Sequence, residues 1–202
     1  DELLAARAHE GLESQITEEV KRQRFDACQV AIEKLADVYA EVKPDICVMV
    51  GDDQMELFRE AIPPFSVHWG ETIENGPPSH TAPPPPAAPG FTASGSRPAP
   101  APMYSPDHDV VYPGVPELGL HIIKTMMADS IDVTSVKELP PRANGRKIIP
   151  HAYGFIYKRI MRDQAIPSVP VIINTFYPPN QPPVMRCVEF GKSLLKAIES
   201  WD

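Results

Sequence analysis

The stretch Val169–Ser200, VPVIINTFYPPNQPPVMRCVEFGKSLLKAIES, decides the fold of this chain. It opens with an apolar, largely β-branched run from Val169 to Ile173, which predicts a strand buried on both faces. The prolines of Tyr177–Asn180 predict a sharp turn. Beyond this turn, apolar residues recur every three or four positions between charged ones, which predicts an amphipathic helix packed against the sheet. The apolar positions of this helix are Cys187, Phe190, Leu194, Ile198 and Trp201.

Polar residues follow the buried run directly. Open α/β sheets place their ligands beyond the carboxyl ends of parallel strands, and Asn174, Thr175 and Tyr177 lie at such an end. We therefore take these three residues as candidate substrate-binding residues. The alternative interpretation is a strand end and a proline-rich turn that bind no ligand.

A long helix is expected at residues 17–42. Thr17, followed by two glutamates, provides a hydroxyl cap and an acidic first turn, both of which suit the positive end of the helix dipole. Lys43-Pro44 is expected to end the helix. The periodicity predicts that one face of this helix is buried, and that face carries Phe25, Cys28, Ile32, Leu35, Val38 and Tyr39.

A second buried strand is expected at Ile46–Val50, and it too ends in polar residues. Asp52, Asp53 and Gln54 follow it, and a short helix is expected at residues 55–61. These polar side chains mark a second candidate wall of a site. The alternative is that Asp52 or Asp53 only caps the short helix.

The remaining elements complete an α/β pattern. Strands are expected at residues 65–69 and 131–136, and helices at 116–128 and 151–161. Helices that alternate with strands are typical of the α/β class, here a three-layer sandwich with a central, mostly parallel sheet flanked by helices. We expect one domain over residues 1–202, since this length builds one core.

Residues 75–116 are dominated by Pro, Ala, Gly and Ser. This composition does not form a packed core, and it predicts a long, polyproline-like excursion over the surface. His80 and His108 lie within it without the spacing of metal ligands.

Composition and charge exclude several functional classes. A net charge of −8 with scattered Lys and Arg argues against nucleic-acid binding, and no apolar run is long enough to span a membrane. The three cysteines, without framework spacing, suggest reduced thiols, and no signal peptide is recognisable, so a cytoplasmic location is expected. A homodimer is one possible assembly of this chain.

The chain begins at Asp1 inside a helical pattern, and we expect it to be a piece of a longer protein.

Several motifs together resemble the class III (LigB-type) extradiol ring-cleavage dioxygenases. The nearest branch is the group of 3-O-methylgallate, gallate and protocatechuate 4,5-dioxygenases. The resemblance covers most of the chain except the proline-rich excursion. It is carried by VMVGDDQMELF at 48–58, WGET at 69–72, IPHAYGFI at 149–156, and the block 174–200 with NTFYPPN, Arg186-Cys187 and Gly191.

The resemblance implies an Fe(II)-dependent enzyme that uses dioxygen to cleave the ring of a catechol beside its two hydroxyls. In this family two His and one carboxylate hold the iron on one face and leave positions for the diol and for dioxygen. Gln54 stands where relatives carry a ligand His. Three interpretations follow: Gln54 binds iron weakly, Asp52 or Asp53 replaces it, or ligands outside this chain hold the iron.

By the same resemblance, His151 matches a family His that lines the substrate pocket, and we take it as the candidate catalytic residue. The alternative role of His151 is that of a helix-start residue hydrogen-bonded to a backbone group.

Tyr153 and Tyr177 are candidate pocket walls, because aromatic rings stack on a flat substrate. The alternative is that they are core residues. His68 is expected to be a hydrogen-bonded core residue rather than a ligand. The competing function is a non-catalytic homologue that serves as a scaffold or partner-binding subunit. A hydrolase or nucleotide-binding domain is not favoured, because neither G-x-S-x-G nor a phosphate-binding glycine loop is present.

Overall fold

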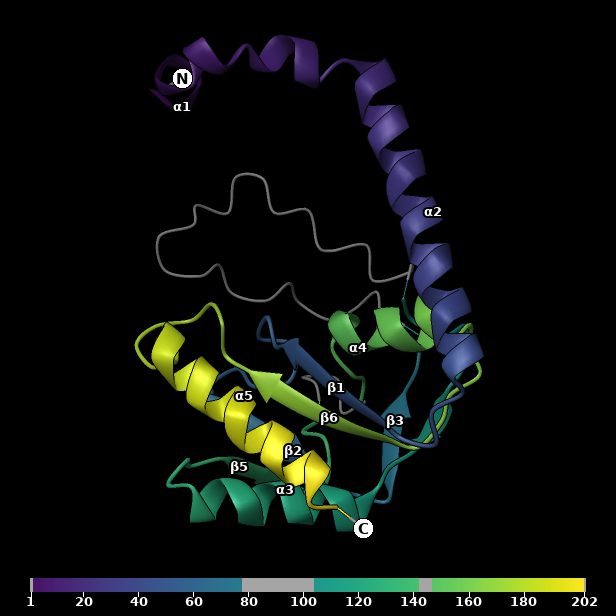
Figure 1. Ribbon diagram of the computed structural model, residues 1–202, viewed down its shortest axis with the longest axis vertical. Helices are drawn as coiled ribbons and strands as arrows, with labels where there is room; N and C mark the ends of the chain where they lie inside the picture. The colour runs from purple at the N-terminus through teal and green to yellow at the C-terminus, as the bar shows by residue number, and fades with distance from the viewer. Residues whose placement is uncertain (1, 78–103, 142–146, 202) are drawn as a thin grey trace. The chain divides into compact units, whose positions relative to one another are not determined.

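The computed structural model describes residues 2–77, 104–141 and 147–201 (Figure 1). The chain separates into two compact units, residues 1–43 and residues 44–202. Each unit is described by itself below. Apart from the helix predicted at residues 17–42, the elements of the predicted sandwich lie in the second unit, and the single-domain assignment of residues 1–202 stays a prediction.

The first unit is helical. It contains α1 (Glu2–Ala6), the short 3-10 turns η1 (Ala8–Glu10) and η2 (Leu12–Gln15), and α2 (Glu18–Val42). Thr17 caps α2 as predicted, and its Oγ1 accepts a hydrogen bond from the Val20 N–H at 3.3 Å. The predicted burial of the apolar face of α2 is wrong for Phe25, Cys28, Leu35 and Val38, which are exposed, whereas Ile32 and Tyr39 are partly buried. Periodicity indicates which face of a helix is apolar but not what covers that face.

The second unit is built on a four-stranded sheet with the order β1-β6-β2-β5. Its strands are β1 (Cys47–Asp52), β6 (Ser168–Ile173), β2 (Phe65–His68) and β5 (Thr134–Val136). The pairs β1–β6 and β2–β5 are parallel, whereas β2 runs antiparallel to β6. The sheet is therefore mostly parallel, as predicted. The carboxyl ends of β1 and β6 share one edge, and those of β2 and β5 lie at the opposite edge.

Helices cover both faces of this sheet, so the unit is a three-layer sandwich. On one face, α3 (Pro116–Ala128) and α5 (Val184–Glu199) pack against alternate residues of β6 and β2, and Phe65 stacks on Phe190 with ring centroids 4.3 Å apart. On the other face, α4 (His151–Phe155) lies against β1, where Gly51 closely approaches Tyr153, and continues into the π-helical turn η4 (Ile156–Ile160). The core of the first face is formed by Phe65, Val67, Leu118, Ile122, Met126, Ile131, Val169, Val171, Phe190, Leu194 and Ala197.

Three sequence predictions about local structure need correction. The excursion predicted at residues 75–116 has strands at its described ends, because β3 (Thr72–Asn75) pairs antiparallel with β4 (Val110–Pro113). Its proline-rich centre at 78–103, which includes His80, lies outside the described residues. Residues 55–61 form bends rather than a helix. The helix predicted over 151–161 is a single α-helical segment that continues as a π-helical turn.

A pair of glycines tests how closely α3 packs on the sheet. A Cβ at Gly119 would lie 2.7 Å from the His68 carbonyl oxygen and 2.8 Å from the Trp69 Cα, whereas a Cβ at Gly191 of α5 meets no atom within 4 Å. We expect Gly119→Ala to destabilise the protein by about 2 kcal/mol, because backbone atoms must move. Gly191→Ala is the control and should stabilise it by roughly 0.5–1 kcal/mol through helix propensity. Urea denaturation measures both, and equal effects would contradict the close packing.

Candidate functional site

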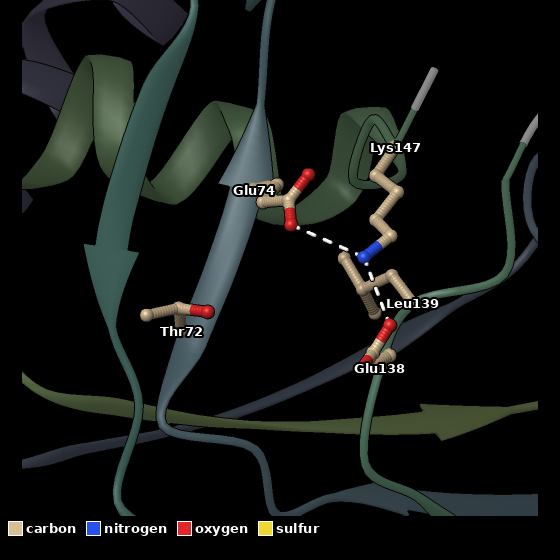
Figure 2. A pocket seen from close by; sticks show the side chains of 5 residues that line it. All are labelled: Thr72, Glu74, Glu138, Leu139 and Lys147. Carbon is tan, nitrogen blue, oxygen red and sulfur yellow. Dashed lines mark hydrogen bonds and ion pairs between the residues drawn. The ribbon is translucent and has the colours of Figure 1, made fainter. Parts of the chain in front are cut away.

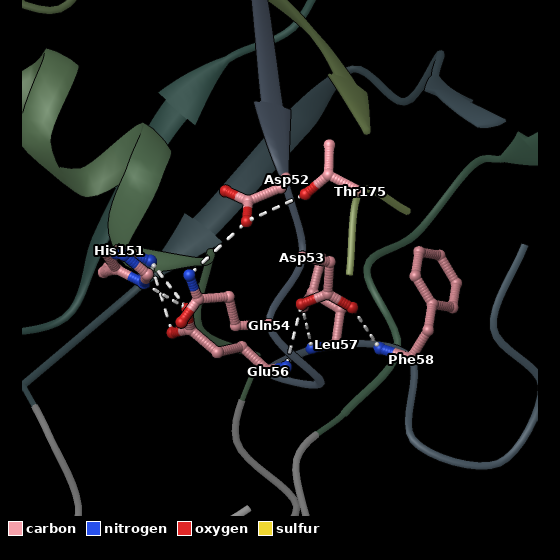
Figure 3. A network of polar contacts seen from close by, with 8 residues as sticks. All are labelled: Asp52, Asp53, Gln54, Glu56, Leu57, Phe58, His151 and Thr175. Carbon is pink, nitrogen blue, oxygen red and sulfur yellow. Dashed lines mark hydrogen bonds and ion pairs between the residues drawn. The ribbon is translucent and has the colours of Figure 1, made fainter. Parts of the chain in front are cut away.

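The polar residues after β1 and β6 meet at one edge of the sheet. Asp52 is the last residue of β1 and lies beside Ile173, the last residue of β6. The Asp52 Oδ2 accepts hydrogen bonds from the Thr175 Oγ1 and from the Gln54 Nε2, each at 3.4 Å (Figure 3). Two of the predicted residues, Gln54 and Thr175, are thereby linked through the carboxylate of Asp52.

Asp53 organises the loop that follows β1. Its side chain is 3% exposed, and its two oxygens accept hydrogen bonds from the backbone N–H groups of Glu56, Leu57 and Phe58 at 2.8–2.9 Å. Burial raises the pKa of this carboxyl, and the three N–H bonds act in the opposite direction. The structure thus places Asp53 in a turn-capping position, without the helix expected there, and its iron-binding role stays a prediction that this geometry does not favour.

Glu56 joins this loop to His151. The Glu56 carboxylate accepts hydrogen bonds from the His151 backbone N–H, at 3.3 Å to Oε1 and 3.2 Å to Oε2, and its Oε1 also contacts the ring Nδ1. Figure 3 shows Gln54 and Glu56 both extending from the loop toward His151 at the start of α4. The imidazole is thus brought to the edge that carries Asp52 and Thr175.

Asn174 is used inside its own turn. Its side chain is 1% exposed and donates to the Tyr177 carbonyl at 2.8 Å, while its Oδ1 accepts from the N–H groups of Phe176 and Tyr177. The Asn174 amide also donates to the Asn180 Oδ1 at 3.1 Å. This is an Asx-type turn, in which the side chain replaces backbone hydrogen bonds. The predicted substrate contact of Asn174 stays untested, and the geometry favours the turn.

The two predicted tyrosines are both buried, but their surroundings differ. Tyr153 is 1% exposed, and its hydroxyl donates to the Val171 carbonyl at 2.6 Å and lies 3.3 Å from the Gly51 carbonyl, which favours the core interpretation. Tyr177 is also buried, and burial raises the pKa of its phenol, as do the negative charges of Asp53, Asp52 and Glu56. Tyr177 therefore lies in the electrostatic field of the carboxylates at this edge.

Glu56 is the site residue that sequence reasoning missed. It lies three positions after Asp53, inside the quoted VMVGDDQMELF motif, so its neighbourhood was marked as polar. Its partner is His151, 95 residues further along the chain. No local pattern in the sequence identifies such a pair, because only the packing of α4 on β1 brings the two together.

Other polar groups lie away from this edge. His68 is buried at the far end of β2, as predicted, but the hydrogen bond predicted for it is wrong, because neither ring nitrogen has a partner among the described residues. A hollow of about 100 Å³ is lined by Thr72, Glu74, Glu138, Leu139 and Lys147 (Figure 2). There the Lys147 Nζ pairs with Glu74 at 3.2 Å and with Glu138 at 3.0 Å, which lowers the pKa of the Glu138 carboxyl. The hollow is smaller than ordinary ligand pockets, and its charges tie β3 to the segment after β5.

Comparison with known proteins assigns the family. The family described as the catalytic LigB subunit of aromatic ring-opening dioxygenase matches residues 31–202. The chain belongs to the LigB family. No curated protein matches the chain. The match includes β1, β6, α4 and α5, so every residue of the candidate site described above lies within it.

The described side chains of this LigB chain do not supply the ligands that such an iron centre requires. A non-haem Fe(II) centre of this type needs two imidazoles and a carboxylate on one face. Within residues 2–77, 104–141 and 147–201, no three His, Cys, Asp or Glu side chains are grouped to hold a metal. Gln54 offers only an amide, and Asp53 directs both oxygens to backbone donors. The described residues therefore do not form a complete iron site.

None of the described helices of the LigB chain combines the length and the apolar character that a bilayer crossing requires.

Proposed function

We propose that this LigB-family protein is an extradiol-type dioxygenase that cleaves the aromatic ring of a catechol beside its two hydroxyls. The substrates that we propose are gallate-, methylgallate- or protocatechuate-like diols, with dioxygen as co-substrate and Fe(II) as the cofactor. The observation that carries this proposal is the meeting of His151 with the polar ends of β1 and β6. The family match supports the general reaction class.

His151 is the residue that we propose for proton transfer. Ring cleavage of a diol requires its hydroxyl protons to be removed and returned, and an imidazole titrates in the range where this is efficient. His151 is anchored through its backbone N–H and its Nδ1 by one carboxylate. Thr175, whose side chain is exposed beside Asp52, provides a hydroxyl that a substrate oxygen or carboxylate would contact.

The test of the proposed function uses two measurements on the protein. The first is iron content after anaerobic reconstitution, and the second is the formation of a yellow ring-cleavage product from a panel of catechols. Bound iron together with the product supports the dioxygenase. A protein that binds iron under no condition and leaves every catechol intact would contradict it.

A second candidate function is a non-catalytic member of the family that acts as a scaffold or partner-binding subunit. Two observations favour it: Gln54 occupies the position where we expect a ligand His, and no metal-binding group of three side chains is found in the part of the chain that the structure describes. Absence of both iron and product would select this function.

Gln54 can be tested directly. If its side chain faces the metal, Gln54→His should tighten iron binding by at least about tenfold, because imidazole is a better ligand for iron than a neutral amide. The affinity is measured by anaerobic titration of the metal-free protein. Gln164→His, an exposed replacement of the same kind, is the control. Equal iron affinity in the two variants would remove Gln54 from the metal site.

A further inference from the structure

The contact between Glu56 and His151 determines which ring nitrogen carries the hydrogen as well as where the imidazole lies. One carboxylate, 18% exposed, receives the backbone N–H of His151 on both oxygens and the ring Nδ1 on Oε1. An ionised carboxylate accepts hydrogen bonds and donates none. The backbone N–H shared by both oxygens favours the ionised form, since charge-assisted bonds are the stronger ones. The hydrogen in the Glu56–His151 contact is then carried by Nδ1.

From this geometry we infer that Glu56 is the positioning residue that sets the tautomer of His151. A neutral imidazole carries one hydrogen on one nitrogen and an acceptor lone pair on the other. With the hydrogen held on Nδ1 by Glu56, the lone pair is on Nε2. The nitrogen that accepts a proton is thereby chosen by Glu56, a residue to which the sequence analysis assigned no role.

Glu56 is itself held in place by the loop. Asp53 accepts hydrogen bonds from the N–H groups of Glu56, Leu57 and Phe58, so the backbone that carries the Glu56 side chain is fixed from a buried position. Asp53, next to the end of β1, thus holds the backbone of Glu56, and Glu56 in turn holds the imidazole of His151. This arrangement assigns Asp53 to holding the loop and Glu56 to orienting the ring.

The inference rests on the proposed function, because a defined Nε2 lone pair is what proton removal from a diol hydroxyl requires. In that reaction Nε2 forms a bond to the hydroxyl proton, and the electron pair of the broken O–H bond stays on the diol oxygen. The resulting positive charge on the imidazolium faces the negative charge of Glu56 at Nδ1. Glu56 acts through His151 and touches no substrate in this scheme.

The tautomer is measured directly by long-range ¹H–¹⁵N spectra of the metal-free protein with labelled histidine. The spectra are recorded above the ordinary imidazole pKa of about 6.5. His151→Asn assigns the His151 signals by their loss. We expect the Nδ1–H form in the unmodified protein. In Glu56→Leu the ratio of Nδ1–H to Nε2–H should fall by about tenfold, the scale of a charge-assisted hydrogen bond.

Two further variants sharpen the test. Glu56→Gln keeps an oxygen acceptor of the same shape and should retain most of the Nδ1–H form, and it serves as the second variant if Glu56→Leu does not fold. Glu60→Leu removes an exposed acid from the same loop and should leave the ratio unchanged. An Nε2–H tautomer in the unmodified protein, or equal ratios in Glu56→Leu and Glu60→Leu, would overturn the inference. Lack of ring cleavage would overturn the proposed function alone, since the tautomer ratio needs no activity.

Discussion

His151→Ala should lower the turnover of catechol cleavage by roughly 10²–10⁴-fold, the range that a positioned acid–base group supplies. The stability of the fold should change much less. The His151 side chain is 28% exposed, so water can replace it beside Glu56, and we expect a loss of about 1 kcal/mol. Steady-state oxygen consumption gives the turnover, and thermal unfolding gives the stability.

A matched histidine separates a functional loss from a general one. His108 is exposed and takes part in none of the hydrogen bonds described at the site, so His108→Ala should leave both turnover and unfolding temperature near their original values. If His151→Ala lowers stability in proportion to turnover, the residue is structural, and the helix-start interpretation of His151 is the right one.

The second large effect concerns stability in acid. His68 is 1% exposed, and neither ring nitrogen has a hydrogen-bond partner among the described residues. Burial lowers the pKa of His68 from 6.5 to about 4, because the imidazolium would lose its hydration without gaining a partner. The unfolded chain binds a proton at His68 below about pH 6.5, and the folded chain only below about pH 4. The free energy of unfolding should therefore fall as the pH drops from 6.5 to 4, by roughly 3 kcal/mol in total.

His68→Leu is the variant that isolates this effect. Leucine has a comparable volume and no polar atoms, so the variant should lack the contribution of His68 to the pH dependence. Urea denaturation at several pH values between 4 and 7, on both proteins, gives the difference. Carboxyl groups such as Asp129, whose pKa is lowered chiefly by its hydrogen bond to Lys196, contribute to both proteins and cancel. Parallel curves for the two proteins would show that His68 does not remain neutral in the folded state.

Much of the fold could be predicted because periodicity and capping are local properties. The β-branched run ending at Ile173 and the apolar positions of α5 predict their elements to within one or two residues, and Thr17 predicts the start of α2. The reversed direction of β2 could not be predicted, since a fully buried strand looks alike in either orientation. β3 and β4 are short, and the neighbouring prolines concealed them.

The convergence of the polar strand ends could be predicted from the sequence, but the contacts of the individual side chains could not. Gln54 and Thr175 meet because β1 and β6 are parallel neighbours, and the rule that ligands lie beyond parallel strand ends points to this edge. It does not distinguish side chains that face outward from those that hold a turn. Asn174 and Asp53 are of the second kind, and their roles depend on backbone donors that only the folded loops bring within reach.

The hydroxyl of Tyr153 bonds α4 to the sheet and so fixes the position of His151, which lies two residues earlier in the same helix. The hydroxyl lies close to the carbonyls of Val171 on β6 and Gly51 on β1, which are adjacent strands. Both contacts can therefore form only in one alignment of β6 with β1. Sliding one strand by a single residue would separate these carbonyls and draw α4 away from the edge. Homologous proteins that keep this tyrosine should therefore tolerate changes of loop length but not insertions inside either strand. An insertion would change the alignment of the strands and, with it, the position of the histidine.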